Sequence, residues 1–383
     1  MELIIQKSNM LIYIVLLTYL KPINVTLIEP LDKLYKLLKI VATIILLFEV
    51  IKKKIKISKT CWWCILFLSI WSVSIFLNNG SLAGNTQSIL SIVGIMILYM
   101  YSLNEENGIC RLIIILSNIA KIYIIFNFIT VLLNRPLFAT PKISYVKYFL
   151  GSDNYFAFIL IPLCGFIFIN DLNMIGRIKV SSWIIAFVGL LSLIIPFSVT
   201  GMFTLGVYLF VMIFVNFPQI KKYFTIKNVI IFSALFLLII MIPNVQRYLK
   251  TAMIVGKNGL NSRETIWPLA MSAIIKKPIL GYGALTEKQI SDYILYGTSH
   301  AHNILLEFLL NTGIIGSTVA GIWSYSIFKD LFEVRDKIVE CLLLCIAAYV
   351  LCGVFDFYMD LIYFWLLIFS LDFYKKYKLK KQI

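Results

Sequence analysis

The chain has 383 residues, of which 60% are hydrophobic and only 14% charged, and its mean hydropathy is +0.90. A soluble globular protein of this length carries more charge, so these values exclude a soluble enzyme or binding protein. The net charge of +16 comes from 35 Lys and Arg against 19 Asp and Glu. In so apolar a chain, we interpret this positive excess as a signal for orientation in the membrane and as a means of binding anionic ligands. No nucleic acid partner is expected.

Apolar runs recur along the whole sequence. A bilayer needs about 20 apolar residues per helix, because backbone polar groups cannot be hydrated in lipid. The runs lie near residues 3–20, 34–51, 61–77, 87–103, 109–133, 154–170, 181–197, 202–216, 228–243, 303–328, 338–355 and 361–373. The first is followed by Lys21-Pro22 without a small-residue cleavage site, which indicates a retained signal anchor.

These runs predict an all-α integral membrane protein with about twelve transmembrane helices. Residues 1–243 form an N-terminal transmembrane bundle, residues 244–302 a large extracytoplasmic loop, and residues 303–383 the C-terminal transmembrane helices. The three parts are expected to act as one functional unit.

The distribution of Lys and Arg predicts the orientation. Twenty of them lie in connections on the side of both termini, and fourteen lie on the other side. The positive-inside rule therefore places both termini in the cytoplasm.

The outward cations gather in two places, residues 134–150 and the loop 244–301. They are either a solvated face that meets lipid headgroups or a field that concentrates an anionic substrate. The candidates for substrate binding are Arg135, Lys142, Lys147 and Arg247, with Lys250 beside them.

Residues 261–283 of the large loop, NSRETIWPLAMSAIIKKPILGYG, predict an amphipathic helix. Ser262 is expected to cap it, and its apolar residues recur at helical spacing up to Lys277-Pro278. Gly281-Tyr282-Gly283 then allows a tight turn or a close backbone approach. The helix is expected to lie on the membrane surface.

The only two histidines, His300 and His302, stand just before the run 303–328. Neither a nearby Cys nor an HExxH pattern completes a metal site, so no metal and no cofactor are expected. All seven cysteines fall in predicted spans, and the pair Cys61 and Cys64 is interpreted as packing.

Polar residues inside the apolar runs are costly in lipid unless they face a cavity or a partner. Asn303, Glu307 and Asn311 form one stripe at helical spacing, so Glu307 is expected either to line the site or to form a structural ion pair. Lys121 is a candidate cavity residue, and Asp153 is expected to cap a helix. Gly313, Ser317 and Gly321 form a small-residue stripe that predicts close helix packing.

One combined pattern resembles a known family. Arg263 followed by Trp267, then KPILGYG, then His302-Asn303 with Leu306 and the glycines 313 and 316, resembles the C-terminal signature of the O-antigen polymerase and O-antigen ligase superfamily. The resemblance covers residues 261–316. An earlier Ser-Arg-Gly of many relatives reads Ser198-Val-Thr-Gly201 here, without the arginine.

The resemblance implies a GT-C-like fold in the bacterial cytoplasmic membrane and an undecaprenyl-pyrophosphate-linked glycan as donor. Arg263 is then the pyrophosphate clamp, and His302 is either the base that accepts a proton from a sugar hydroxyl or the group that orients this hydroxyl, while His300 is more typical of a structural residue. The expected product is a polysaccharide; the alternatives are ligase-type transfer to another acceptor and a lipid-linked oligosaccharide flippase. A chain-length regulator and a flippase of the same pathway are the expected protein partners.

Overall fold

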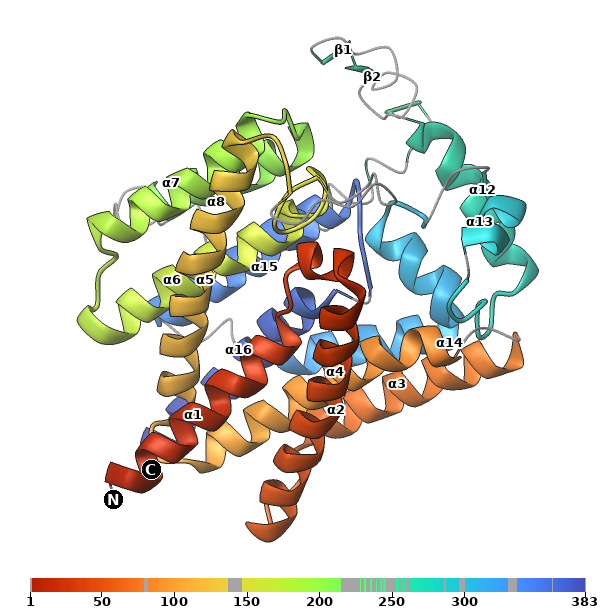
Figure 1. Ribbon diagram of the computed structural model, residues 1–383. Coiled ribbons are helices and arrows are strands. Elements are labelled where there is room, and N and C mark those ends of the chain that lie inside the picture. The colour runs from red at the N-terminus through yellow and green to blue at the C-terminus, as the bar shows by residue number, and fades with distance from the viewer. Residues whose placement is uncertain are drawn as a thin grey trace.

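The computed structural model of the chain describes residues 2–78, 82–136, 147–214, 262–285, 287–295, 300–329, 336–359 and 361–382, together with scattered positions between 228 and 258. Helices dominate it (Figure 1). The N-terminal bundle holds α1 (Glu2–Tyr19), a 3₁₀ turn (Ile23–Leu27), α2 (Glu29–Lys52), α3 (Lys59–Leu77), α4 (Leu82–Asn104), α5 (Gly108–Leu132), α6 (Ala157–Ile175), α7 (Val180–Ile194) and α8 (Val199–Phe214).

The C-terminal half follows a small two-stranded hairpin, β1 (Met253–Ile254) and β2 (Lys257–Asn258). Its helices are α12 (Arg263–Lys276), α13 (Glu287–Tyr293), α14 (Ile304–Phe328), α15 (Lys337–Gly353) and α16 (Ile362–Gln382). The predicted run 228–243 lies largely outside the described residues.

Helix α6 lies at the centre of the bundle. Every residue from Ala157 to Asp171 is buried, and α5, α7, α8, α15 and α16 all pack against this helix. The outer helices instead expose large apolar side chains, for example Phe48, Phe76 and Ile184. A buried centre surrounded by an apolar exterior is the arrangement that a bilayer favours.

Within the described residues, five helices are long and apolar enough to cross a membrane, namely α3, the part of α4 from Asn85, α5, α6 and α14. Shorter apolar helices run over Met10–Tyr19, Val180–Ile194 and Val199–Ile213. The chain is therefore an all-α membrane protein, as its composition predicts.

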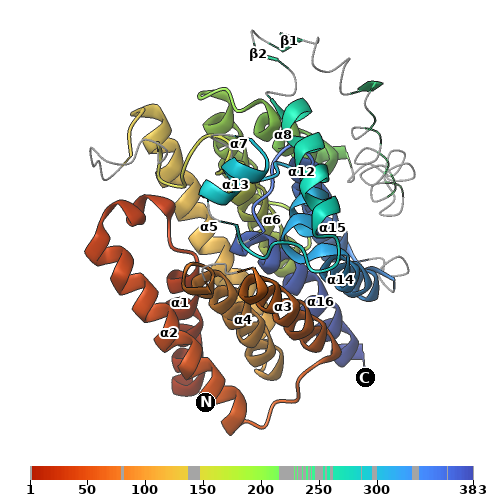
Figure 2. The same ribbon diagram turned by 90° about the vertical axis from the view of Figure 1, so that its right-hand side faces the viewer.

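The connections that the charge pattern places on one side also meet in space. Lys376 donates to Ser58 and Thr60, which joins the basic tail to the loop before α3. Lys378 pairs with Asp336 at 3.2 Å, which joins the tail to the start of α15. Both termini lie at this end of the bundle, and α12 and α13 lie at the other (Figures 1 and 2).

The KPILGYG segment is inserted into a break in α14. Gly313 has φ 60° and ψ −165°, which interrupts the helix. Around the break, Tyr282 N–H donates to Leu310 O at 2.7 Å and Ile314 N–H donates to Pro278 O at 2.8 Å. A Cβ on Gly281 or Gly313 would lie within 2.5 Å of backbone oxygen, so the approach requires glycine on both segments.

Two predicted helix caps are wrong. Ser262 has φ 71° and its side chain makes no capping bond to α12, so the helix starts from a left-handed turn. Helix α6 begins only at Ala157, after Phe156, and Asp153 instead pairs with Lys147 at 3.4 Å.

The apolar face of α12 is only partly buried. Trp267, Ala270 and Ile274 are buried and share an apolar cluster with residues of α13 and α14, whereas Met271 and Ile275 are exposed. The end of the helix at Lys276 and the turn at Gly281 and Gly283 agree with the sequence.

Candidate functional site

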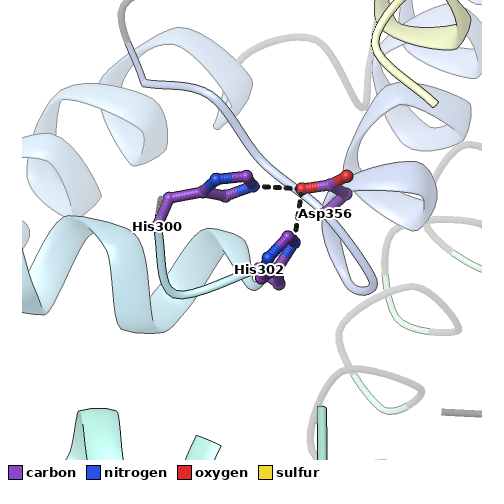
Figure 3. A group of neighbouring side chains, drawn as sticks. All are labelled: His300, His302 and Asp356. Carbon is purple, nitrogen blue, oxygen red and sulfur yellow. Dashed lines mark hydrogen bonds and ion pairs between the residues drawn. The ribbon is translucent and has the colours of Figure 1, made fainter. Parts of the chain in front are cut away.

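Two histidines and one aspartate form a buried cluster where α14 begins and α15 has just ended (Figure 3). His300 Nε2 and His302 Nδ1 both bond to Oδ1 of Asp356, the latter at 3.1 Å. The two imidazole rings lie 3.9 Å apart between centroids. His302 is the more accessible, with 23% of its side chain exposed against 9% for His300 and 5% for Asp356.

The ends of two helices hold this cluster in place. Asn303 caps α14, since its Oδ1 accepts from the N–H groups of Leu305 and Leu306. Its Nδ2 donates to Val354 O at 3.0 Å, in the segment that carries Asp356. His302, directly before the cap, has φ 51°, so the chain bends sharply there. Asn303, which was expected to line the site, therefore fixes the distance between the start of α14 and the segment that carries Asp356.

The cluster also sets the charge of each group. Burial would raise the pKa of the Asp356 carboxyl, but hydrogen bonds from His300 and His302 outweigh it and hold that pKa well below its usual value. Burial opposes a charge on His300 as well, yet the bond to Asp356 raises its pKa above 6.5. For His302, burial dominates over Asp356 and lowers the pKa below 6.5.

These shifts define the tautomer of His302. An ionised carboxylate only accepts, so the bond to Asp356 requires a proton on Nδ1. In the neutral ring, Nε2 is then the acceptor, which is the form that a general base needs.

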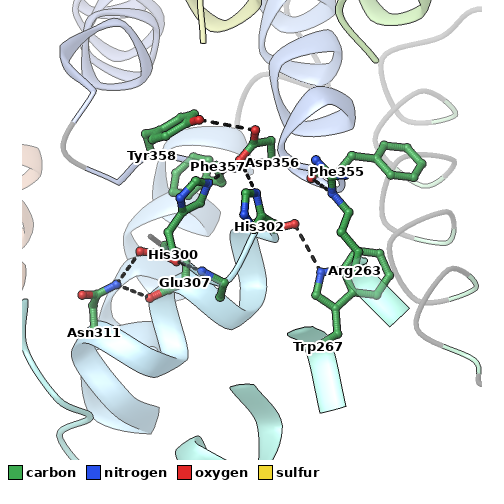
Figure 4. Close-up of polar contacts among 11 residues, drawn as sticks. Arg263, Trp267, His300, His302, Glu307, Asn311, Phe355, Asp356, Phe357 and Tyr358 are labelled. Atoms are coloured by element: carbon green, nitrogen blue, oxygen red, sulfur yellow. Dashed lines mark hydrogen bonds and ion pairs between the residues drawn. The ribbon is translucent and has the colours of Figure 1, made fainter. Parts of the chain in front are cut away.

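Arg263 and Trp267 of α12 reach the same cluster (Figure 4). Arg263 Nε donates to Phe355 O, one residue before Asp356, and the arginine is only 9% exposed. Trp267 Nε1 donates to His302 O at 3.3 Å. The structure thus brings together Arg263 and His302, the two residues that the sequence predicts as catalytic.

Glu307 lies one turn into α14, beside His300. Its carboxylate accepts from Ala301 N–H at 2.9 Å and from Asn311 Nδ2 at 2.9 Å. Glu307 and Asn311 are therefore bonded to each other beside His300, while Asn303 bonds to the segment that carries Asp356.

The donor set of the cluster can also hold a metal ion. One ligand atom each from His300, His302 and Asp356 lies within 4.8 Å of the others. Two imidazoles and a carboxylate are common ligands of zinc and of iron. Asp356 supplies the further ligand that the sequence near the histidines lacks.

The remaining candidates lie elsewhere or outside the described residues. Arg135 is exposed after the end of α5, and Lys147 is exposed and pairs with Asp153. Lys121 is half-buried in the middle of α5. Within the described residues, these three side chains do not bond to the cluster. Arg247 and Lys142, with Lys250, fall outside the described residues.

Asp356 is not among the residues expected from the sequence, because 54 residues separate it from His302. A signal was nevertheless present: the runs 303–328 and 338–355 cross in opposite directions, so the connection after the second returns to the side of His302. Asp356 is the first residue of that short connection. Tyr358, whose ring lies 4.5 Å from His300, follows two residues later.

The fold and this cluster define a polytopic membrane protein with a buried His–Asp–Arg site at one end of its bundle. Residues 154–320 match the family described as O-antigen ligase, which confirms the resemblance to the O-antigen polymerase and ligase superfamily. This match supports glycan transfer of the polymerase or ligase type as the coarse activity. It includes Arg263 and His302, whereas Asp356 lies beyond it. No curated protein matches the chain.

Proposed function

We propose that the chain is a polysaccharide polymerase that joins undecaprenyl-pyrophosphate-linked repeat units on the outer face of the bacterial cytoplasmic membrane. A hydroxyl oxygen of the acceptor sugar attacks the anomeric carbon of the donor glycan. The bond between that carbon and the pyrophosphate oxygen breaks, and the lipid pyrophosphate leaves with the bonding electrons. The hydroxyl proton passes to Nε2 of His302.

The observation that carries this proposal is the pairing of His302 with Asp356 beside Arg263. Asp356 holds His302 in the base tautomer and stabilises the imidazolium that proton transfer forms. Arg263 brings a permanent positive charge to the leaving group, and its Nε bond to Phe355 O fixes the plane of the guanidinium.

A pyrophosphate leaving group needs charge stabilisation and no protonating acid, so the proposed transfer requires no metal and no cofactor. In this scheme, the bonds that His300 and His302 make to Asp356 hold the base in place. The expected partners are the lipid-linked glycan and the bilayer, with a chain-length regulator and a flippase of the same pathway. Both termini are proposed to be cytoplasmic.

Two alternatives use the same chain differently. A ligase would transfer the finished glycan to another acceptor with the same residues. A flippase would need charges distributed through the spans along a path, whereas the described polar network gathers at one end of α14 and α15.

The experiment is a ladder assay on the purified full chain in lipid nanodiscs with undecaprenyl-pyrophosphate-linked repeat units. We expect the wild type to form longer products with and without EDTA, and His302→Ala to reduce the rate about 10²- to 10⁴-fold. Arg263→Ala should also be severely impaired. Lys276→Ala, an exposed cation in the last turn of the same helix, is the matched control and should behave as wild type.

Three results count against the proposal. Loss of the ladder in EDTA would show that the cluster works through a metal. Normal ladders from folded His302→Ala and Arg263→Ala would remove the site assignment. Transfer to a different acceptor, without any ladder, would favour the ligase.

A further inference from the structure

A pocket of about 260 Å³ lies on the His300 side of the cluster. Its walls are formed by Trp71 of α3, Asn85 of α4, Ala284 and Leu285 after the KPILGYG segment, Ile290 of α13, Glu307, Leu310 and Asn311 of α14, and Phe357 to Met359 after α15. His300 lines it on the side of the cluster. We call it the Trp71 pocket.

Trp71, on the wall of this pocket, carries a buried donor that lacks a partner among the described residues. Trp71 is 2% exposed, and its indole Nε1 has no hydrogen-bond partner among the described residues. Leaving such a group unpaired is unfavourable, and natural structures rarely do so without a reason. A ligand atom that accepts this N–H would remove the penalty.

Acceptors stand on another wall of the same pocket. Asn311 uses its Nδ2 to bond to Glu307, so its amide oxygen is the atom left to accept. The Glu307 carboxylate, which accepts from Ala301 and Asn311, lies on the same wall. The pocket therefore combines a donor, acceptors and aromatic rings at a short distance from His302.

This combination fits one class of ligand. Sugar hydroxyls both donate and accept, and the apolar faces of a sugar ring pack on aromatic side chains. An anionic group is disfavoured because Glu307 contributes negative charge to the wall. The volume is below the roughly 300–1,000 Å³ of pockets for drug-sized ligands, which suits a single ring.

The position of the Trp71 pocket indicates which sugar it takes. In a single displacement at an anomeric carbon, the attacking and leaving oxygens lie on opposite sides of that carbon. Figure 4 shows Arg263 on one side of His302, and His300, Glu307 and Asn311 on the other. With the pyrophosphate at Arg263, the opposite side belongs to the acceptor.

Building on the glycan transfer proposed above, we infer that the Trp71 pocket is the acceptor subsite and binds an uncharged sugar ring of the acceptor glycan. Trp71 Nε1 donates to a sugar oxygen, and Glu307 and Asn311 accept from hydroxyls. Trp71 is thus a residue for acceptor recognition. It takes no part in the bond changes at the anomeric carbon.

The test separates acceptor from donor by using the repeat-unit oligosaccharide released from its lipid by mild acid. Without a pyrophosphate it can accept but cannot donate. With lipid-linked donor kept saturating, Trp71→Phe should raise the KM for the released oligosaccharide about three- to tenfold, the effect of one hydrogen bond. The KM for the donor should stay within about twofold. Trp62→Phe, at an exposed position of the same helix, is the control.

A second variant does not depend on the hydrogen bond. Leu285→Trp places a large ring on the pocket wall, away from the histidines, and should weaken acceptor use more than Trp71→Phe does. An unchanged acceptor KM in both variants overturns the inference. So does a change in donor KM alone, which would assign the ring to the donor.

Binding without turnover distinguishes failure of this inference from failure of the proposed function. Saturation-transfer NMR should detect the released oligosaccharide on wild type and on His302→Ala, and a much weaker signal on Leu285→Trp. Equal signals on wild type and Leu285→Trp overturn the acceptor subsite, whatever the ladder assay gives. Normal ladders from His302→Ala, with the expected NMR differences, would leave the subsite and remove the proposed base.

Discussion

Polar side chains of α7 and α8 differ from two that hold the site together. On α7 and α8, Ser192 donates to Val188 O and Thr204 donates to Thr200 O, each within its own helix. At the site, Ser74 donates to Leu280 O and Asn303 donates to Val354 O, in distant segments. The first two bonds leave other elements unconstrained, whereas the last two fix the position of another segment. Substitutions should reveal this difference.

The largest effect on turnover is expected from removing the carboxylate that orients His302. Asp356→Asn keeps the size of the side chain but removes the charge that selects the Nδ1-protonated ring. Turnover should fall about 10²- to 10⁴-fold, with a smaller change in KM. Glu105→Gln, which breaks a pair with Lys53 at the opposite end of the bundle, should retain wild-type turnover in the same ladder assay. Comparable losses in both variants would contradict the contrast.

The next effect concerns two glycines of one helix. In Gly313→Ala, the new Cβ lies 2.3 Å from Ile279 O, in a backbone conformation that L-residues avoid. The free energy of unfolding should therefore fall by about 1–3 kcal/mol. Gly321→Ala is the matched control, because nothing described lies within 4 Å of its Cβ position, and should be neutral or stabilising by up to about 1 kcal/mol.

A thiol-reactive dye can follow thermal unfolding of both glycine variants, since six of the seven cysteines are buried. Equal melting temperatures for Gly313→Ala and wild type would mean that the break in α14 does not need glycine. A much lower melting temperature for Gly321→Ala would instead support the predicted close helix packing at Gly313, Ser317 and Gly321.

The smallest effect is the pH dependence near neutrality. The base form of His302 is neutral, and burial lowers its pKa below 6.5, so more than half of it is active at pH 6.5. The rate of ladder formation should change less than about twofold between pH 8 and 6.5 and fall under more acidic conditions. A rate that declines as the pH rises above neutrality would point to protonated His300 as the acting group, because the pKa of His300 is raised.

Local signals in the sequence predicted much of the site. The helix from Arg263, the turn at Gly281 and Gly283, and the placement of His302 at the start of an apolar run all depend on neighbouring residues. The helical spacing of Asn303, Glu307 and Asn311 likewise follows from 3.6 residues per turn. The class of the fold follows from composition alone.

The rest depends on contacts between distant segments. Nothing in the sequence near His302 indicates Asp356, and nothing near Trp71 indicates that its indole lines a pocket beside Glu307. The small-residue stripe was misinterpreted for the same reason. Gly313 accommodates the backbone of residues 278–282, which only the tertiary structure reveals, while Gly321 is exposed.

Because the KPILGYG segment is inserted into the break in α14, this segment and the break can be exchanged between relatives only together. Its backbone bonds to Leu310, Asn311, Ile314 and Ile315 leave no tolerance for an altered length on either side of the break. Anyone who builds chimaeras between relatives to alter glycan choice must therefore exchange residues 278–283 together with residues 310–315. A graft of one stretch alone would displace the wall of the Trp71 pocket even though every residue of the His–Asp pair had been kept.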